Sequence, residues 1–438
     1  MNDARARCHN RPMTSSPVRA RIPSLAAFAA VSVAASLLSG CTLFGDPFFK
    51  RGEPEAAPPP AKPVGLPPVA THRFEFDPVR DEVLGVIQKT VVGPEDTLPD
   101  IARRFNLGYE EIVRANPGVD PWLPGEGREI VLPTQFVLPN APREGLVINV
   151  PAMRLFYYPK REKDQPKDAP TVVYTYPIGI GKVGWATPEG VTKVLKRTKD
   201  PTWRVPASIR KEHLEMGDEL PPVVGPGPDN PLGAHSFTLG WPSYLVHGTN
   251  KPYGVGMRSS HGCIRLYPED IAHLFDAVPI GTQLRVVNQP FLIGHSADDV
   301  VMQSYGVMED DKRAWDKARQ KLIEKSITQN TRKVLKEREQ EIDWVRVDAL
   351  AHESRGVPVS VVSPEASTDT VLLTARKVEN IVPEGANWDG VIEVDEAKFQ
   401  ELLSDREPAG TEAGDAEPAA TEAQSAPNNG TGSKQLER

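Results

Sequence analysis

The hydrophobic pattern of residues 86–135 changes period twice and predicts a strand, two helices and a second strand. Asp96 and Thr97 are good N-cap residues, and the apolar residues that follow them recur at spacings of three and four, as on one face of a helix. A second helix is predicted to begin near Tyr109 and to end at Asn116, which precedes a proline. With a closing strand at residues 129–132, this segment is predicted to be a small βααβ module.

Residues 144–288 have a different pattern, with short alternating segments separated by glycine and proline turns. Strands are predicted at residues 146–159, 171–178 and 191–198, and few stretches have helical spacing. This segment is therefore expected to form a mostly β domain.

Residues 289–403 form a third region, an extension of helical and mixed character. Residues 291–307 continue the β pattern, and residues 308–350 are charged with apolar positions near helical spacing, which predicts a long helix. The helix either packs on its own domain or forms a coiled arm that binds a partner, and its irregular apolar repeat favours packing. Three more strands are predicted at residues 357–362, 371–378 and 391–394.

Composition adds linkers to this picture. The chain has 438 residues and 44 prolines, about twice the ~5% that is usual in globular proteins. Its length allows two or three domains. Residues 41–80 are rich in proline and are expected to form an extended spacer, whereas residues 404–438 are expected to be a disordered acidic tail.

The net charge of −8 argues against nucleic acid as a partner, because phosphate binding needs a concentrated basic surface and the sequence has no basic stripe. A multi-span membrane protein is excluded as well, since the apolar run at residues 25–38 is shorter than the ~20 residues of a span. Arginines precede this run, which is the order of an export signal.

The apolar run ends in the tetrad LSGC at residues 38–41, which resembles the lipobox of bacterial lipoproteins. The resemblance implies that residues 1–40 are a signal peptide and that Cys41 receives a lipid that anchors the chain. Thr42 stands where an aspartate would favour the inner membrane, so the periplasmic side of the outer membrane is expected. The alternatives are an uncleaved anchor or a signal cut elsewhere, and Met13 is an alternative start.

Three cysteines, Cys8, Cys41 and Cys263, are too few for a disulfide framework, and their number is odd. Cys8 precedes the apolar run and Cys41 is the predicted lipid site, so Cys263 needs a separate explanation. A lone cysteine is often a buried apolar residue, but a free thiol in an oxidising compartment is a liability unless it is used.

Cys263 lies in a segment that offers what a cysteine nucleophile needs: a base, a setting that favours the thiolate, and N–H donors for an oxyanion. His247 ends an apolar strand and is the candidate base. The N–H groups of the turn at Cys263 are candidate oxyanion donors, and Arg265 and His261 are expected to favour the thiolate by their positive potential. The turn itself is formed by Ser260, His261, Gly262 and Cys263.

A zinc site is the alternative that these residue types allow, with His235, His247, His261 and Cys263 as ligands. The long gaps between them are uninformative, and His-Gly-Cys is not a common ligand spacing. No metal and no other cofactor is therefore predicted.

The βααβ segment resembles the LysM module in its DTL, IA, ANPG and IVLP motifs. In that family a groove beside the strand–helix loops binds N-acetylglucosamine chains, so the resemblance implies peptidoglycan as a partner. Pro94 and Glu95 replace the usual Gly-Asp turn. A packing module that has lost its sugar site is therefore the alternative.

Residues 144–288 resemble the L,D-transpeptidase (YkuD-like) domain, in the LysM-bearing periplasmic branch of that family. The likeness rests on HGTN at residues 247–250, SHGCIR at residues 260–265 and an upstream YPIGIG segment. It implies a mostly β protein with some α, in which a β-sandwich carries Cys263 as nucleophile and His247 as base. The residues that it implies for the pocket are Ser260, His261, Gly262 and Arg265.

The reaction implied by this resemblance is acyl transfer, in which Cys263 attacks the third residue of a tetrapeptide stem, D-alanine leaves and an amine resolves the thioester. Diaminopimelate of another stem would give a crosslink, a lysine of an outer-membrane lipoprotein would give a covalent anchor, and a D-amino acid would give exchange. Water as acceptor would make the protein a hydrolase, and a non-catalytic tether between wall and membrane is the third hypothesis.

Overall fold

The computed structural model describes residues 72–382 except for residues 162–163, 165 and 167–169. The predicted signal peptide, Cys41 and the acidic tail lie outside the described residues. Within residues 72–382, apart from those gaps, no helix is both long enough and apolar enough to cross a bilayer.

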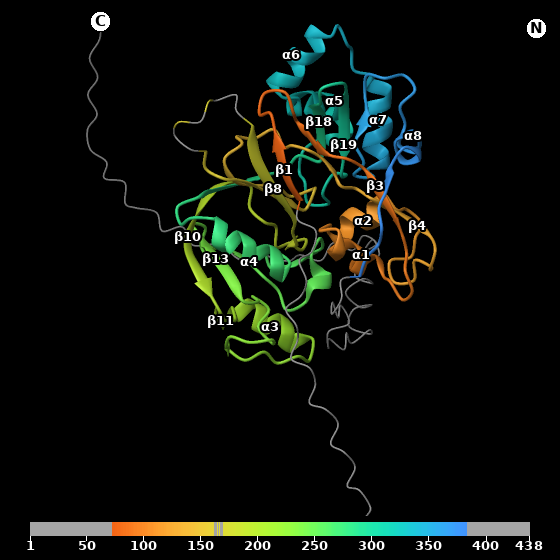
Figure 1. Ribbon diagram of the computed structural model, residues 1–438. Coiled ribbons are helices and arrows are strands. Elements are labelled where there is room, and N and C mark those ends of the chain that lie inside the picture. The colour runs from red at the N-terminus through yellow and green to blue at the C-terminus, as the bar shows by residue number, and fades with distance from the viewer. Residues whose placement is uncertain (1–71, 162–163, 165, 167–169, 383–438) are drawn as a thin grey trace, which may run out of the picture. The chain divides into compact units, whose positions relative to one another are not determined.

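A nine-stranded sheet carries the central domain, in the order β1-β8-β7-β6-β17-β10-β13-β14-β16. Figure 1 labels its strands β1, β8, β10 and β13. β6 runs parallel to β17 and β14 runs parallel to β16, whereas the other neighbours are antiparallel. Its strands are β1 (His72–Phe76), β6 (Gly145–Asn149), β7 (Arg154–Tyr158), β8 (Thr171–Pro177), β10 (Gly190–Lys199), β13 (His235–Leu239), β14 (Leu245–His247), β16 (Ile264–Arg265) and β17 (Gln283–Val287).

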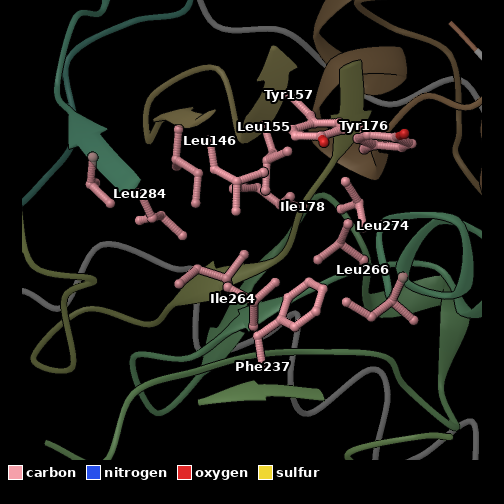
Figure 2. Packing of buried hydrophobic residues seen from close by; sticks show 14 of the residues in the cluster. Leu146, Leu155, Tyr157, Tyr176, Ile178, Phe237, Ile264, Leu266, Leu274 and Leu284 are labelled. Atoms are coloured by element: carbon pink, nitrogen blue, oxygen red, sulfur yellow. The ribbon is translucent and has the colours of Figure 1, made fainter. Parts of the chain in front are cut away.

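One apolar core lies against this sheet. It takes Leu155 from β7 and Ile264 from β16, which are far apart in the strand order, together with Leu274 of helix α4 (Pro268–Ala277). Figure 2 shows these side chains gathered in one cluster. The sheet therefore curls around a shared core, in agreement with the predicted β-sandwich.

Strand β1 lies inside the predicted spacer, so the expectation of a linker over residues 41–80 is wrong at its C-terminal end. β1 pairs antiparallel with β8, and Phe76 is buried in an apolar cluster. Its sequence, HRFEF, alternates apolar and polar residues as an edge strand does. Because residues 41–80 are rich in proline overall, their composition alone did not indicate this short strand.

The predicted βααβ module is present. Its elements are β3 (Gln88–Val91), α1 (Leu98–Arg104), α2 (Tyr109–Ala115) and β4 (Glu129–Leu132). Thr97 caps α1, because its hydroxyl accepts from the Asp100 N–H and the Asp100 carboxylate accepts from the Thr97 N–H. Apolar side chains of both helices share a core with Val147 and Phe156 of the central sheet.

A fully buried arginine joins this module to the sheet. Arg154 of β7 donates to Glu111 of α2 at 2.7 Å and to the carbonyl of Asn106 at 2.8 Å. Its third nitrogen donates to the Thr175 hydroxyl at 3.2 Å, and its guanidinium lies 4.2 Å from the centre of the Phe136 ring. Each nitrogen of Arg154 thus has a partner.

Where one long helix was predicted over residues 308–350, the structure has three short helices, so that prediction is wrong. They are α5 (Trp315–Ser326), α6 (Gln329–Glu337) and α7 (Trp344–Glu353). Ile327 has an extended backbone, and the Thr328 hydroxyl accepts from the Thr331 N–H at 3.0 Å to begin a new helix. The apolar side chains of the helices pack on their own sheet, β18-β19-β20, together with Ile87 and Ala115 of the preceding part of the chain.

The predictions for the last strands are met in part. β20 (Val359–Ser360) lies within the first predicted range. The second range begins inside helix α8 (Thr368–Leu373) and contains only the short strand β21 (Arg376–Lys377). The third predicted range, residues 391–394, lies outside the described residues.

Strand β21 returns to the LysM-like module and pairs with β3. The Val378 carbonyl accepts from the Thr90 hydroxyl at 2.9 Å, and the Asn380 amide donates to the Asp96 carboxylate at 2.6 Å. The sheet of the module is therefore completed by a strand nearly three hundred residues away in sequence. The remaining elements are β2 (Val83–Gly85), β5 (Gln135–Val137), β9 (Ile180–Gly181), β11 (Trp203–Arg204), α3 (Ala207–Glu215), β12 (Val223–Val224), η1 (Pro252–Gly254), β15 (Arg258–Ser260), β18 (Phe291–His295) and β19 (Val300–Ser304).

Candidate active site

The parallel pair β14 and β16 positions the candidate residues. Val246 pairs with Ile264 and both are fully buried in the core, whereas His247 pairs with Arg265. Successive side chains of a strand point to opposite faces, so His247 and Arg265 share the face away from the core. Cys263 directly precedes β16 and lies two residues before Arg265. The fold thus brings together two segments of the sequence at one edge of the sheet.

The turn before Cys263 is held closed by its own residues. The Ser260 hydroxyl donates to the Cys263 carbonyl at 2.6 Å. Gly262 has φ +97, in the left-handed region, and a Cβ there would lie 2.8 Å from Cε1 of Tyr244. This position therefore needs glycine for both its backbone conformation and its space.

The orientation of the peptide between Gly262 and Cys263 is fixed by Thr187. The Thr187 hydroxyl donates to the Gly262 carbonyl at 3.1 Å and accepts from the Gly181 N–H at 3.2 Å. In a trans peptide the next N–H points the opposite way from the carbonyl, so the Cys263 N–H points away from Thr187. In the described part of the chain, the N–H groups of Gly262 and Cys263 donate to no protein acceptor.

His247 is buried and neutral. Its Nδ1 lies 2.6 Å from the Gly248 carbonyl, which fixes Nδ1 as the donor and leaves Nε2 as an acceptor. Burial, aided by the positive charge of Arg265, lowers the pKa of His247 to about 3, against the smaller opposing effect of the bond to Gly248. Nε2 of the neutral imidazole therefore carries no proton, and the lowered pKa also makes it a weaker base than a free histidine.

The thiol of Cys263 is partly buried, and its Sγ lies 3.8 Å from the Ser243 carbonyl. Burial raises the pKa of the Cys263 thiol, although a backbone hydrogen bond from Leu245 and the charge of Arg265 act in the opposite direction. The charge of Arg265 thus acts in the expected direction, but burial outweighs it and the net shift disfavours the thiolate. The desolvation that decides the direction is not visible in the sequence.

His261 is engaged with another element. Its Nε2 lies 2.7 Å from Oε2 of Glu212 in α3, and the same carboxylate also pairs with Lys182. Burial lowers the pKa of His261, and Glu212 opposes this shift. The ring of Trp185, which is 38% exposed, meets His261 edge to face at 5.0 Å. His261 therefore joins the turn to α3.

Arg265 is held by few partners. Its Nη1 donates to the Ser259 hydroxyl at 3.2 Å, and its Nε is buried with no hydrogen-bond partner among the described residues. Burial lowers the pKa of Arg265, and the nearby Cys263 and Tyr253 raise it. The charge of Arg265 thus acts on both Cys263 and His247.

The four residues of the alternative zinc set do not form a ligand cluster. His235 lies on β13 with its ring 4.6 Å from that of Phe275. Among the residues that the structure describes, no three His, Cys, Asp or Glu side chains are placed to hold a metal ion.

Sequence reasoning missed several residues that shape the site. Glu212 and Thr187 are distant from Cys263 in the chain, and no local motif marks them. Ser243, whose carbonyl lies near the Cys263 thiol, has φ +67, which is unusual for a residue other than glycine. Only the folded arrangement places these residues around the turn at Cys263.

Comparison with known proteins gives two family matches. Residues 143–287 match the model of the L,D-transpeptidase catalytic domain, and residues 90–133 match that of the LysM domain.

Two bacterial relatives match over longer stretches. The chain is 41% identical over 231 residues to the probable L,D-transpeptidase YcfS of Escherichia coli K12, covering 52% of this chain and 70% of that relative. It is 34% identical over 284 residues to the probable L,D-transpeptidase ErfK/SrfK of Salmonella typhimurium, covering 62% of this chain and 85% of that relative. Among solved structures, the catalytic domain of the E. faecium L,D-transpeptidase matches at 22% identity and a TM-score of 0.25, over 34% of this chain and 99% of the other.

Proposed function

The chain belongs to the L,D-transpeptidase family, and on this premise we propose that it transfers peptidoglycan stem peptides through a thioester on Cys263, with His247 as general base. The observation that supports this proposal best is the pairing of His247 with Arg265 next to a tight turn whose Gly262 and Cys263 N–H groups point to no protein acceptor. A base, a thiol and oxyanion donors are then available on one edge of the sheet.

In the first step, the Cys263 sulfur attacks the carbonyl of the third residue of a tetrapeptide stem. The thiol proton passes to Nε2 of His247, and the N–H group of Cys263 donates to the oxyanion. The C–N bond to D-alanine breaks, the leaving amine takes the proton from His247, and a thioester remains.

In the second step, an acceptor amine attacks the thioester carbon. His247 takes a proton from the amine and returns it to the sulfur as the C–S bond breaks, and a new amide is formed. Diaminopimelate, a lipoprotein lysine and a free D-amino acid all satisfy this chemistry. No step needs a metal or an organic cofactor.

The charge states at the site support a concerted proton transfer. The raised pKa of Cys263 and the lowered pKa of His247 both favour the neutral thiol–imidazole pair before substrate binds. Arg265 acts against the first shift and with the second, so its charge makes the thiol more acidic while it keeps the base neutral. Proton transfer is therefore expected to accompany attack rather than precede it.

Mass spectrometry of the products from purified protein and tetrapeptide fragments tests the transferase. Crosslinked dimers or exchange products are expected, and Cys263→Ala should abolish them. Tripeptides alone, without dimers or exchange products, would replace the transferase by the hydrolase alternative. Unchanged wall composition in a Cys263→Ala strain would favour the non-catalytic tether.

The location of the protein in the cell envelope is a further part of the proposal. We infer that Cys41 is lipidated after removal of residues 1–40 and that the chain is held at the outer membrane, with the LysM domain bound to glycan. The support is the LSGC tetrad followed by Thr42. Labelling with an alkyne fatty acid should mark the wild-type protein and leave Cys41→Ala unmarked. Comparing crosslinks and wall-bound lipoprotein with and without the gene identifies the acceptor.

A further inference from the structure

The segment between His247 and Cys263 is bonded directly to the LysM domain. The N–H of Tyr109, at the start of α2, donates to the Val255 carbonyl at 3.1 Å, and the N–H of Glu110 donates to the Gly256 carbonyl at 3.1 Å. The first N–H groups of a helix have no partner within the helix, so they are available for such bonds. The first turn of α2 therefore holds the chain just before β15.

Two glycines allow this close approach. A Cβ on Gly256, which has φ +85, would lie 2.2 Å from the Tyr109 nitrogen and 2.4 Å from Cα of Gly108. A Cβ on Gly108 would lie 2.8 Å from Cα of Gly256. The atoms on both sides belong to the backbone, so no side chain is able to move aside. We call this contact between Gly108–Glu110 and Val255–Gly256 the backbone clamp.

Apolar side chains cover the clamp. Tyr109 and Met257 are buried against each other, and Trp122 and Tyr253 pack around them. Met257 in turn accepts from the Ile180 N–H at 3.0 Å through its carbonyl. The clamp is thus part of a packed contact rather than an isolated pair of hydrogen bonds.

The clamped segment also lies close to Arg265. A Cβ on Gly254 would lie 3.1 Å from Nη1 of Arg265, and the charge of Arg265 acts on the neighbouring Tyr253 phenol. Among the described residues, the Arg265 side chain donates one hydrogen bond, to Ser259 in the same connection. A shift of this connection would therefore move the guanidinium away from Cys263 and His247.

We propose that the LysM domain positions the active site: through the backbone clamp, the first turn of α2 fixes residues 253–257, and these hold Arg265 beside Cys263 and His247. This inference rests on the proposed roles of Cys263 and His247. It gives the LysM domain a part in the chemical step that is separate from sugar binding. Gly108 and Gly256 are positioning residues.

The test uses full-length Gly108→Ala and Gly256→Ala with a soluble tetrapeptide stem that carries no glycan. Gly108 has φ −90, so alanine there adds the clash without backbone strain, and Gly225→Ala is its control because that Cβ meets nothing within 4 Å. Gly256→Ala is matched by Gly281→Ala in the same domain, at φ +88 and also in open space. Amide exchange at Tyr109 and Glu110 reports whether the clamp has opened, and thermal unfolding reports folding.

Both clamp variants are expected to remain folded, to exchange the two amides faster and to lower kcat by ~10- to 100-fold with a smaller change in KM. Both controls should stay within about twofold of wild type. Faster exchange with an unchanged kcat would overturn the inference. If the wild type gives tripeptides only, the transferase proposal fails, whereas kcat for hydrolysis still decides the role of the clamp.

Discussion

Arg154 is fully buried and Arg265 is half-buried with a buried Nε, and their charges are compensated to different degrees. Arg154, at the junction between the LysM and catalytic domains, has a carboxylate partner in Glu111 and a partner for each nitrogen. Arg265, at the candidate active site, has a single hydrogen bond to a hydroxyl and a buried Nε without a partner among the described residues.

This difference separates a structural charge from a charge kept for chemistry. Burying a charge costs free energy, and a paired carboxylate with full hydrogen bonding offsets that cost. At Arg154 the offset is complete within the protein. At Arg265 it is incomplete, and the uncompensated field falls on Cys263 and His247. The compensated charge of Arg154 thus contributes to stability, whereas the charge of Arg265 leaves an electrostatic potential that acts on the active-site residues.

The largest expected effect is on stability at the junction. Arg154→Met leaves Glu111 buried without its cation and is expected to lower the free energy of unfolding by about 3–5 kcal/mol. Arg265→Met removes a charge that has no carboxylate partner and should change it by less than about 1 kcal/mol, or raise it. Denaturant unfolding measures both. Equal losses of unfolding free energy in the two variants would contradict this difference between the two arginines.

The next effect is on activity at the site. Arg265→Met is expected to lower kcat by about 100-fold, since a fixed charge near the reacting atoms stabilises the transition state. Arg265→Lys should recover part of this loss, because it keeps the charge but not the planar guanidinium. Steady-state kinetics with a soluble tetrapeptide measures this. A Met variant with wild-type kcat would mean that the charge of Arg265 has no part in catalysis.

The pH dependence of stability compares a half-buried histidine, His72 at the junction, with the buried His247 at the site. Burial lowers the pKa of each from 6.5 to about 3. The folded state therefore favours neutral imidazole, and stability is full above pH 6.5 and is lost as the pH falls towards 3. The slope for one such group is about 1.4 kcal/mol per pH unit.

Replacing either histidine by glutamine is expected to flatten the loss of stability between pH 6.5 and 3, as measured by unfolding at a series of pH values. Only His247→Gln should also abolish transpeptidation. If both variants lost stability at low pH as steeply as the wild type does, burial of these rings would not be the cause of that loss.

The smallest effect concerns two matched serines. Ser260 Oγ donates to the Cys263 carbonyl at 2.6 Å, and Ser326 Oγ donates to the Ile323 carbonyl at 2.7 Å in the extension. Each change to alanine should cost about 1 kcal/mol of stability. Ser260→Ala alone is expected to lower kcat by a few fold, because it loosens the turn at Cys263. A similar loss of kcat in Ser326→Ala would show that the effect is general.

The LysM domain was predictable because its signals are local. The Thr97–Asp100 capping box and the apolar spacing of α1 and α2 lie within a few residues of each other. The turn at Cys263 was likewise visible as a cluster of unusual residue types. In both cases the residues that interact are neighbours in the sequence.

The remaining features depend on contacts across long stretches of chain. Glu212 reaches His261 over 49 residues, and the raised pKa of Cys263 results from burial that no local motif encodes. The extension was mispredicted for the opposite reason. There a local N-cap at Thr328 ends the helical pattern, although the apolar spacing continues through it.

The return of β21 to β3 restricts how this gene can be recombined. Segments that sequence motifs delimit are often regarded as interchangeable parts, but the LysM sheet here includes residues from the far end of the chain. A crossover that replaced residues 86–135 alone would leave Asn380 facing a foreign loop in place of Asp96. Viable exchanges are therefore expected to replace both segments together, so the part of the gene that can be exchanged is larger than the LysM motif.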